Sequence, residues 1–173
     1  MWTADWFILK RLNIELAVTD LIFTENWLYV CGDQGLVKCF QNYLKDEQEN
    51  MMVWTVSSGE MVNCVALWTG AGLVTGSDGG DLIVRNPQSG QLITELTGHQ
   101  KGCGISGLTL GHLGLWSSSF DCSVRLWSDT NFECVAVLTG HANPVSCLAV
   151  DRQAKLQLVL SLIIFQFFRL ILT

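Results

Sequence analysis

Residues 96–141 read LTGHQKGCGISGLTLGHLGLWSSSFDCSVRLWSDTNFECVAVLTGH, a stretch that begins and ends on the same tetrapeptide, LTGH. The histidines of the two tetrapeptides, His99 and His141, are 42 residues apart. A period of roughly 20–50 residues is typical of repeat proteins, in which each repeat is one supersecondary unit. Within the stretch, Asp121 lies just before Ser123–Trp127, a short run rich in strand-forming residues. The stretch therefore predicts a repeated β unit.

Other copies of this unit are found by shifting the sequence by the same period. Residues 119–128 align without a gap on residues 77–86, and a weaker copy lies about 45 residues earlier, at 28–40. A fourth copy begins at Leu138, with 158–161 as its second strand, and the pattern ends after residue 161. We therefore divide the chain into an N-terminal segment (1–17), the repeats (18–161) and an apolar, divergent tail (162–173). The N-terminal segment is either a helix or an outer strand of an earlier repeat.

Each copy is expected to contain four short strands. In the copy with the clearest pattern these strands lie near residues 104–110, 113–118, 123–127 and 134–138. The joints between them carry Gly, Asn, Asp and Ser, which are the residues that tight turns require. No segment between residues 18 and 150 shows a sustained helical apolar period. The sequence therefore predicts an all-β fold.

The Gly98–His99 opening, the turn residue Asp121 and the strand-ending Trp127 resemble the WD-repeat β-propeller family. The resemblance covers roughly residues 18–161 and implies an incomplete propeller, with about three four-stranded blades plus a partial blade. Because propellers typically have about four to eight blades, such a chain does not close a ring by itself. We therefore expect a fragment or truncated isoform of a larger WD-repeat protein, or a chain that completes its ring by self-association.

The resemblance also implies a buried structural hydrogen-bond network in the clearest repeat. It connects His99, Ser117, Asp121 and Trp127 in series. The same residue types could also form a Ser-His-Asp catalytic triad, which needs an exposed hydroxyl and an oxyanion hole. The chain contains no G-x-S-x-G nucleophile elbow, so we favour the structural role. The corresponding positions of the preceding copy keep only the hydroxyl, and they are Ser57, Thr75, Gly79 and Arg85.

The family uses its blades as platforms for other proteins, and the residue before the turn Asp is a frequent contact. That residue is Phe120 in the clearest repeat and Asp78 in the preceding one. We expect Phe120 and Asp78 to contact a protein partner, although Phe120 could also pack over the neighbouring blade. The implied function is a non-catalytic protein–protein interaction scaffold whose partners are other proteins of an intracellular complex.

Composition excludes several other classes of function. A formal net charge of −6 without a basic stripe argues against binding to nucleic acid or anionic membranes. The seven cysteines contain no C-x-x-C pair, which argues against zinc and favours a reducing compartment, the cytoplasm with the nucleus as the alternative. The G-x-G-x-x-G match at residues 102–107 precedes strand-like sequence rather than a helix, so it predicts no dinucleotide site. We expect no catalytic, cofactor-binding or metal site, and no enzyme.

The segment Leu156–Thr173 supplies the alternative interpretation. Thirteen of its 18 residues are apolar, but Gln157, Gln166 and Arg169 interrupt the run. A membrane-spanning helix needs about 20 largely apolar residues. The alternative function is therefore a membrane-associated truncated product that is governed by this tail.

Overall fold

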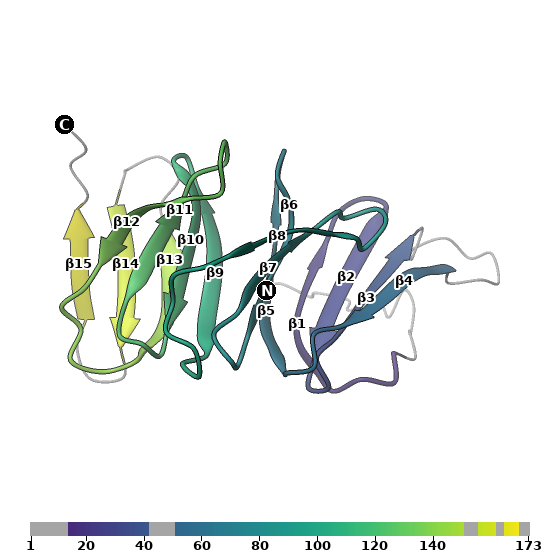
Figure 1. The fold of residues 1–173 in the computed structure, drawn as a ribbon, viewed down its shortest axis with the longest axis horizontal. Helices are drawn as coiled ribbons and strands as arrows, with labels where there is room; N and C mark the ends of the chain where they lie inside the picture. Colours follow the sequence, from purple (N-terminus) through teal and green to yellow (C-terminus); the bar gives the residue numbers. More distant parts are fainter. Residues whose placement is uncertain (1–13, 42–50, 151–155, 162–164, 170–173) are drawn as a thin grey trace, which may run out of the picture.

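The computed structural model describes residues 14–41, 51–150, 156–161 and 165–169. These residues form fifteen β-strands and contain no helix. The strands pair with their neighbours in sequence, always antiparallel, and make four separate sheets that follow one another along the chain (Figure 1). The architecture confirms the all-β prediction.

We number the sheets 1 to 4. Sheet 1 contains β1 (Val18–Phe23), β2 (Trp27–Gly32), β3 (Leu36–Gln41) and β4 (Met51–Ser57). Sheet 2 contains β5 (Val62–Trp68), β6 (Gly72–Ser77), β7 (Leu82–Arg85) and β8 (Leu92–Leu96). Sheet 3 contains β9 (Ile105–Gly111), β10 (Gly114–Ser119), β11 (Val124–Trp127) and β12 (Cys134–Leu138). Sheet 4 contains β13 (Val145–Val150), β14 (Leu156–Ser161) and β15 (Phe165–Arg169).

This arrangement confirms the prediction of three four-stranded units and a partial fourth. The strands of sheet 3 lie within one residue of the ranges expected from the sequence. The last strand, β15, lies inside the segment 162–173 and pairs with β14, from Leu156 opposite Arg169 to Leu160 opposite Phe165. In the described part of the chain, no helix is long and apolar enough to cross a membrane.

Burial within each sheet follows its position between neighbouring sheets. The second strands β6 and β10 are buried at every residue, because other sheets cover both of their faces. The fourth strand β12 alternates between partly buried and exposed residues, since one of its faces meets solvent. The protein core therefore lies between the sheets, near their first and second strands.

Three apolar clusters connect successive sheets. Tyr29 of sheet 1 packs in one cluster with Val65 of sheet 2, Val74 of sheet 2 packs with Leu115 of sheet 3, and Trp116 of sheet 3 packs with Val145 of sheet 4. All of these side chains are buried. Full burial of one such aliphatic side chain contributes ~1.5–3 kcal/mol, so these clusters are the main force that stacks the sheets.

The first strand of each later sheet contributes three apolar side chains to these clusters. We call this set the apolar triplet, and it faces the preceding sheet. Its members are Val62, Val65 and Leu67 in β5, Ile105, Leu108 and Leu110 in β9, and Val145, Leu148 and Val150 in β13. The leading residue of each triplet is almost fully enclosed, at 1 %, 0 % and 0 % exposure. The sheets are thus joined by one interface that is repeated three times.

A polar contact accompanies each triplet. The strand register shifts directly after the first residue of β1, β5 and β9, which leaves Thr19, Asn63 and Ser106 outside the ladder. Such a bulge turns a side chain away from its regular direction. Asn63 Nδ2 donates to the carbonyl of Ile105 over 3.1 Å, and Ser106 Oγ donates to that of Val145 over 2.6 Å. Thr19 donates to the carbonyl of Val62 in the same way.

Residues 14–17 run over the face of sheet 1 that points away from sheet 2. Ile14 and Leu16 pack on three buried side chains of that sheet, Leu28, Val30 and Phe40. Lys38 Nζ donates to the carbonyl of Ile14 over 2.6 Å. These four residues are neither helix nor strand, and the rest of the predicted N-terminal segment, 1–13, lies outside the described residues.

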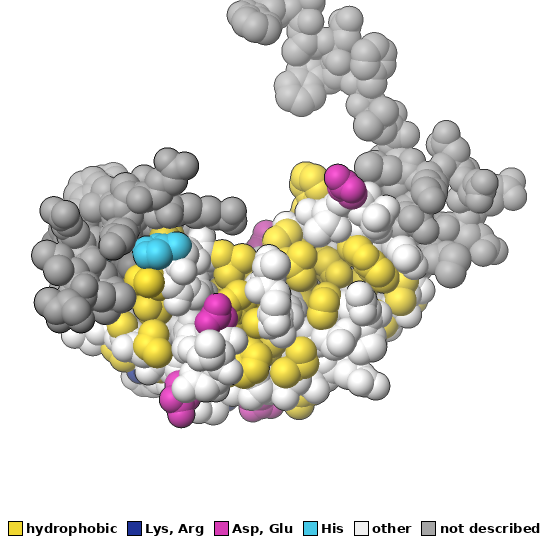
Figure 2. All heavy atoms as spheres, turned by 90° about the horizontal axis from the view of Figure 1, so that it is seen from above, with side chains coloured by type: hydrophobic (Ala, Val, Ile, Leu, Met, Phe, Trp, Pro, Cys, Tyr) yellow, Lys and Arg dark blue, Asp and Glu magenta, His cyan; other side chains and the backbone are white. Residues whose placement is uncertain are grey.

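Seen from above, the sheets form an open arc that is hollowed on one side (Figure 2). Hydrophobic side chains reach this surface over much of its length, while acidic side chains are scattered singly. The arc leaves its two end sheets, 1 and 4, each with one neighbouring sheet.

Candidate functional site

The four residues of the predicted network come from four different segments, in sheet 3 and in the loop that leads into it. His99 lies in the loop between β8 and β9, Ser117 in β10, Asp121 in the turn after β10, and Trp127 at the end of β11. The exposed fractions of His99, Ser117 and Trp127 are 7 %, 0 % and 1 %. The antiparallel pairing of β10 with β11 places Leu115 opposite Trp127, which brings the indole over the strand that holds Ser117.

The structure connects all four side chains in one series. Trp127 Nε1 lies 2.8 Å from Ser117 Oγ, Ser117 Oγ lies 2.8 Å from His99 Nε2, and His99 Nδ1 lies 2.7 Å from Asp121 Oδ2. An indole N–H only donates and an ionised carboxylate only accepts. Trp127 therefore donates to Ser117, and His99 Nδ1–H donates to Asp121. When the His99 ring is neutral, its Nε2 accepts the Ser117 hydroxyl.

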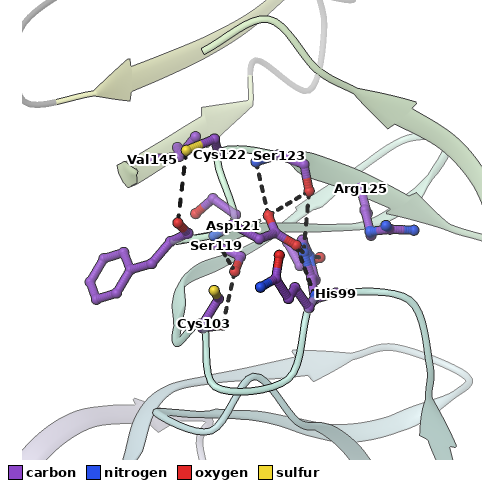
Figure 3. A network of polar contacts seen from close by, with 12 residues as sticks. His99, Cys103, Ser119, Asp121, Cys122, Ser123, Arg125 and Val145 are labelled. Carbon is purple, nitrogen blue, oxygen red and sulfur yellow. Dashed lines mark hydrogen bonds and ion pairs between the residues drawn. The ribbon is translucent and has the colours of Figure 1, made fainter. Parts of the chain in front are cut away.

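Asp121 connects the network to the loop and the turn. Its Oδ2 also accepts the backbone N–H of Gln100 over 3.1 Å, and its Oδ1 accepts the N–H and hydroxyl of Ser123 over 2.9 and 2.6 Å. Figure 3 shows Asp121 between Ser123 and His99 in this arrangement. One carboxylate thus holds the His99 loop against the β10–β11 turn.

The two titratable members have shifted pKa values that fit this arrangement. Burial lowers the pKa of His99 and outweighs the hydrogen bond and the charge of Asp121, so the ring is neutral at pH 7. Burial acts to raise the pKa of Asp121, but the hydrogen bonds from Ser123, His99 and Gln100 outweigh it and hold this pKa below its usual range. The pair is therefore a neutral imidazole that donates to an ionised carboxylate.

Ser117, His99 and Asp121 lie at the distances of a Ser-His-Asp catalytic triad. A nucleophile must also reach its substrate, and Ser117 is fully enclosed. Its oxygen already accepts the Trp127 indole N–H, which covers the position that a substrate would need. This arrangement holds the loop, the strand and the turn together, and it leaves no room for a substrate beside the hydroxyl.

The corresponding positions of sheet 2 do not form such a series. Thr75 Oγ1 donates to the carbonyl of Ile83 over 3.5 Å, Arg85 Nη1 donates to that of Gly90 over 3.3 Å, and Ser57 Oγ accepts the N–H of Gly59 over 3.3 Å. Gly79 supplies no side chain. The alignment of the two repeats therefore correctly indicated that sheet 3 has the network and that sheet 2 lacks it.

The predicted contact residues, Phe120 and Asp78, lie at equivalent places. Each starts the turn between the second and third strands of its sheet, and each is exposed. The Phe120 N–H donates to the carbonyl of Gly104 over 2.9 Å, and the Asp78 N–H donates to that of Met61 over 2.8 Å. Phe120 is 43 % exposed, so it does not lie buried over the neighbouring sheet.

Sequence reasoning missed a third member of this set, Asp33 in sheet 1. Its N–H donates to the carbonyl of Ala17 over 3.2 Å, and the side chain is exposed. The acceptors Ala17, Met61 and Gly104 each come directly before a first strand. We call Asp33, Asp78 and Phe120 the turn row. The weak repeat at 28–40 did place Asp33 in register with Asp78, and this was the signal that could have found it.

Acidic groups surround the middle of the turn row. Glu60 is exposed, and its carboxylate lies over Gly79, next to Asp78, so closely that a Cβ on Gly79 would overlap it. Lys101 forms an ion pair with Asp81 in the same turn region. The row is therefore acidic over sheets 1 and 2 and aromatic over sheet 3.

The structure also locates the G-x-G-x-x-G match and the side chains of the types that bind metal ions. The segment 102–107 runs directly into β9, so no helix N-terminus follows its glycines. Among the described residues, no group of three His, Cys, Asp or Glu could hold a metal ion. The polar residues Asn63 and Ser106, which sequence reasoning also missed, connect adjacent sheets.

We compared the sequence and the fold of this chain with protein families, curated proteins and solved structures. Residues 90–128 and 132–161 match the family model described as WD domain, G-beta repeat. The sequence matches no curated protein. Among solved structures, the crystal structure of RRP9 WD40 repeats matches with a TM-score of 0.70 at 22 % identity, over 86 % of this chain and 46 % of that chain.

Two other solved structures give similar results. The structure of U3-55K matches with a TM-score of 0.70 at 22 % identity, over 86 % of this chain and 46 % of that chain. The crystal structure of the computationally designed Ika4 protein matches with a TM-score of 0.79 at 17 % identity, over 96 % of this chain and 99 % of that chain. The chain thus spans about half the length of the first two structures.

The repeat matches and the sheet architecture agree. Each of sheets 1 to 3 is a four-stranded antiparallel blade, and sheet 3 carries the His99, Ser117, Asp121 and Trp127 series. The matched residues 90–128 contain that whole series. Residues 90–128 and 132–161 are thus WD repeats, and the described residues have the fold of a partial WD-repeat β-propeller whose ring is not closed.

Proposed function

We propose that the chain is a non-catalytic scaffold that binds another protein through the turn row. The observation that carries this proposal is the contrast at two adjacent residues. The Asp121 carboxylate is fixed by four hydrogen bonds, from His99, Gln100 and Ser123, while Phe120 beside it is 43 % exposed. A buried network that fixes a turn makes the exposed aromatic a pre-organised contact, which lowers the entropic cost of binding.

The charges of the turn row define the chemistry of the partner. Asp33, Asp78 and Glu60 are exposed acids, and the whole chain has a formal net charge of −6. A complementary partner segment carries Lys or Arg opposite sheets 1 and 2 and an apolar side chain or pocket opposite Phe120. This partner belongs to an intracellular complex in our proposal, since all seven cysteines are free, as in reducing compartments.

The chain is, in this proposal, a truncated form of a longer WD-repeat protein. Its alignment covers 46 % of the RRP9 WD40 repeats, which supports a parent with more blades. We propose the cytoplasm as its compartment. Fluorescence microscopy of the tagged chain tests this: diffuse cytoplasmic signal is expected, and concentration on a membrane would contradict it.

Site-specific cross-linking tests the binding surface. Phe120→p-benzoylphenylalanine places a photoreactive group in the turn row, and the same group at Val135, 56 % exposed on β12, is the control. We expect a discrete cross-linked protein from position 120 that is absent from position 135. Identical products at both positions, or none from position 120, would overturn the proposal.

The cross-linked protein then allows an affinity measurement. Phe120→Ala is expected to raise the dissociation constant at least about tenfold, as truncation of a central aromatic contact does. Val135→Ala is expected to leave it within about twofold, as for a residue outside the contact. Asp78→Asn should weaken binding more at low than at high salt, because screening reduces the contribution of an exposed charge. Equal affinities for the two alanine variants would contradict the assignment.

A further inference from the structure

The first strand of sheet 1 carries an apolar triplet like those of the other sheets, but none of the described sheets precedes it. Val18 pairs with Gly32 and Leu21 with Val30, as Val62 pairs with Ser77 and Val65 with Thr75 in sheet 2. In this register Val18, Leu21 and Phe23 correspond to Val62, Val65 and Leu67. The exposed fractions of the sheet 1 triplet are 43 %, 49 % and 66 %, whereas Val62 and Val65 are 1 % and 6 % exposed.

The residues that cover the rest of this face leave the triplet open. Ile14 and Leu16 bury Leu28, Val30 and Phe40 in the second and third strands. They do not enclose the first strand, whose residues alternate between exposed and partly buried. Within the chain, the first strand is the part of each blade that meets the preceding first strand. The open part of sheet 1 is therefore the part that normally makes the blade interface.

The opposite end of the arc carries the matching surface. In sheet 2, Cys64 and Ala66 point toward sheet 3, where they pack with the triplet led by Ile105, and each is 6 % exposed. Sheet 4 has the same two residue types in the same register, Cys147 and Ala149, and both are exposed. Sheet 4, at the end of the arc, thus carries the same surface with which sheet 2 contacts an apolar triplet, but in sheet 4 this surface is exposed.

The geometry points to a second copy of this chain as the occupant of both surfaces. We propose that the triplet of Val18, Leu21 and Phe23 in one copy packs on Cys147 and Ala149 of the other, and the reverse. Two such contacts close a ring of eight blades, the upper end of the usual range of about four to eight. A head-to-tail contact that closes in this way gives a discrete assembly rather than a filament.

The polar register agrees with this pairing. The bulged residues Asn63 and Ser106 donate to the carbonyl of the first residue of the next sheet. Ser146 follows Val145 at the same bulge in sheet 4, and Val18 is the first residue of sheet 1. The designed Ika4 protein, of which 99 % aligns with this chain, shows that a chain of this extent and fold can be a crystallisable protein. The proposal is independent of the turn row and its partner.

The mass of the full chain in solution tests the proposal. Sedimentation velocity should give twice the chain mass of 19.2 kDa. Leu21→Asp should give a single chain mass, because it places a charge in the contact, while Leu92→Asp should keep the doubled mass. Leu92 is the matched control, since it is 55 % exposed on the outer strand β8. Circular dichroism must show the same β signal for all three proteins.

The reactivity of Cys147 supplies a second measurement that needs no variant. Its alkylation rate in the wild-type chain should fall as protein concentration rises, because pairing buries the thiol. A wild-type chain of single mass, open-ended aggregation, a doubled mass that Leu21→Asp leaves unchanged, or a Cys147 rate independent of concentration would overturn the proposal.

Discussion

Trp127 donates its indole N–H to Ser117 over 2.8 Å, and the two side chains are 1 % and 0 % exposed. The Ser117 hydroxyl in turn donates to His99 Nε2, so this one hydroxyl satisfies both the buried indole N–H and the buried imidazole nitrogen. Neither neighbour has access to water as a substitute partner. The stability of sheet 3 therefore depends on a single hydroxyl more than on any other polar atom of the network.

Ser117→Ala tests this dependence. It leaves the indole N–H and His99 Nε2 without their partner, and each unsatisfied buried group costs about 1–3 kcal/mol, so we expect a loss of ~2–4 kcal/mol. Thr75→Val changes the corresponding hydroxyl of sheet 2, whose contact with the Ile83 carbonyl is 3.5 Å long, and should cost no more than ~1 kcal/mol. Urea unfolding followed by circular dichroism compares them, and equal losses would contradict the network's role.

The neutral state of His99 makes stability depend on pH. Burial lowers the folded-state pKa of His99 below 6.5, so the unfolded chain takes up the proton first. The contribution of this ring is complete above pH 6.5 and declines as the pH falls from there toward the folded-state pKa. Unfolding free energies at pH 7.5, 6.5 and 5.5 should decrease in that order. His99→Asn should flatten the decline, and an unchanged slope in this variant would count against the assignment.

Thiol reactivity reports on the clusters that join sheet 1 to sheet 2 and sheet 2 to sheet 3. Burial raises the pKa of Cys31 to about 11 and that of Cys39 to about 12, so both are thiols rather than thiolates at pH 8. Cys64 is also buried. Iodoacetamide at pH 8, read by peptide mass spectrometry, should modify Cys122, which is partly exposed in its turn, well before these three. Modification of Cys39 at the rate of Cys122 in the folded chain would show that the interface is open.

Substitution of two glycines distinguishes the cost of backbone strain from the cost of steric overlap. Gly114 and Gly140 both have positive φ, at 134° and 121°. A Cβ on Gly114 would overlap the Trp127 carbonyl oxygen, whereas nothing lies within 4 Å of one on Gly140. Gly140→Ala should cost ~1–3 kcal/mol from strain alone, and Gly114→Ala should cost more because overlap adds to the strain. Thermal unfolding measures both, and a larger loss for Gly140→Ala would argue against the β10–β11 register.

The sequence predicted the parts of the fold that repeat in residue type. The spacing between His99 and His141 gave the repeat period. Aligning the sequence with itself after a shift of 42 residues makes Thr75 equivalent to Ser117 and Arg85 equivalent to Trp127. The pairing of Leu73 with Arg85 and of Leu115 with Trp127 agrees with that register. Short runs of strand-forming residues with turn residues between them sufficed here, because each blade repeats the same order of strands and turns.

Other features depend on contacts that a local pattern does not contain. The bulges at Asn63 and Ser106 turn polar side chains into the next sheet, which only the stacking of sheets makes visible. The contrast between Cys64 and Cys147 likewise requires the position of each sheet along the arc, since the two strands have nearly the same sequence. Asp33 was missed because its repeat keeps the strand pattern but few of the marker residues.

Ser117, His99 and Asp121 have the distances of a catalytic triad but hold the loop and the turn together beneath the exposed turn row. A fluorophosphonate, which labels base-activated serine hydroxyls that solvent can reach, tests this structural role most directly. The folded chain should show no gain in intact mass under conditions that fully label a serine hydrolase run in parallel. A stoichiometric adduct that peptide mapping places on Ser117 would contradict the claim.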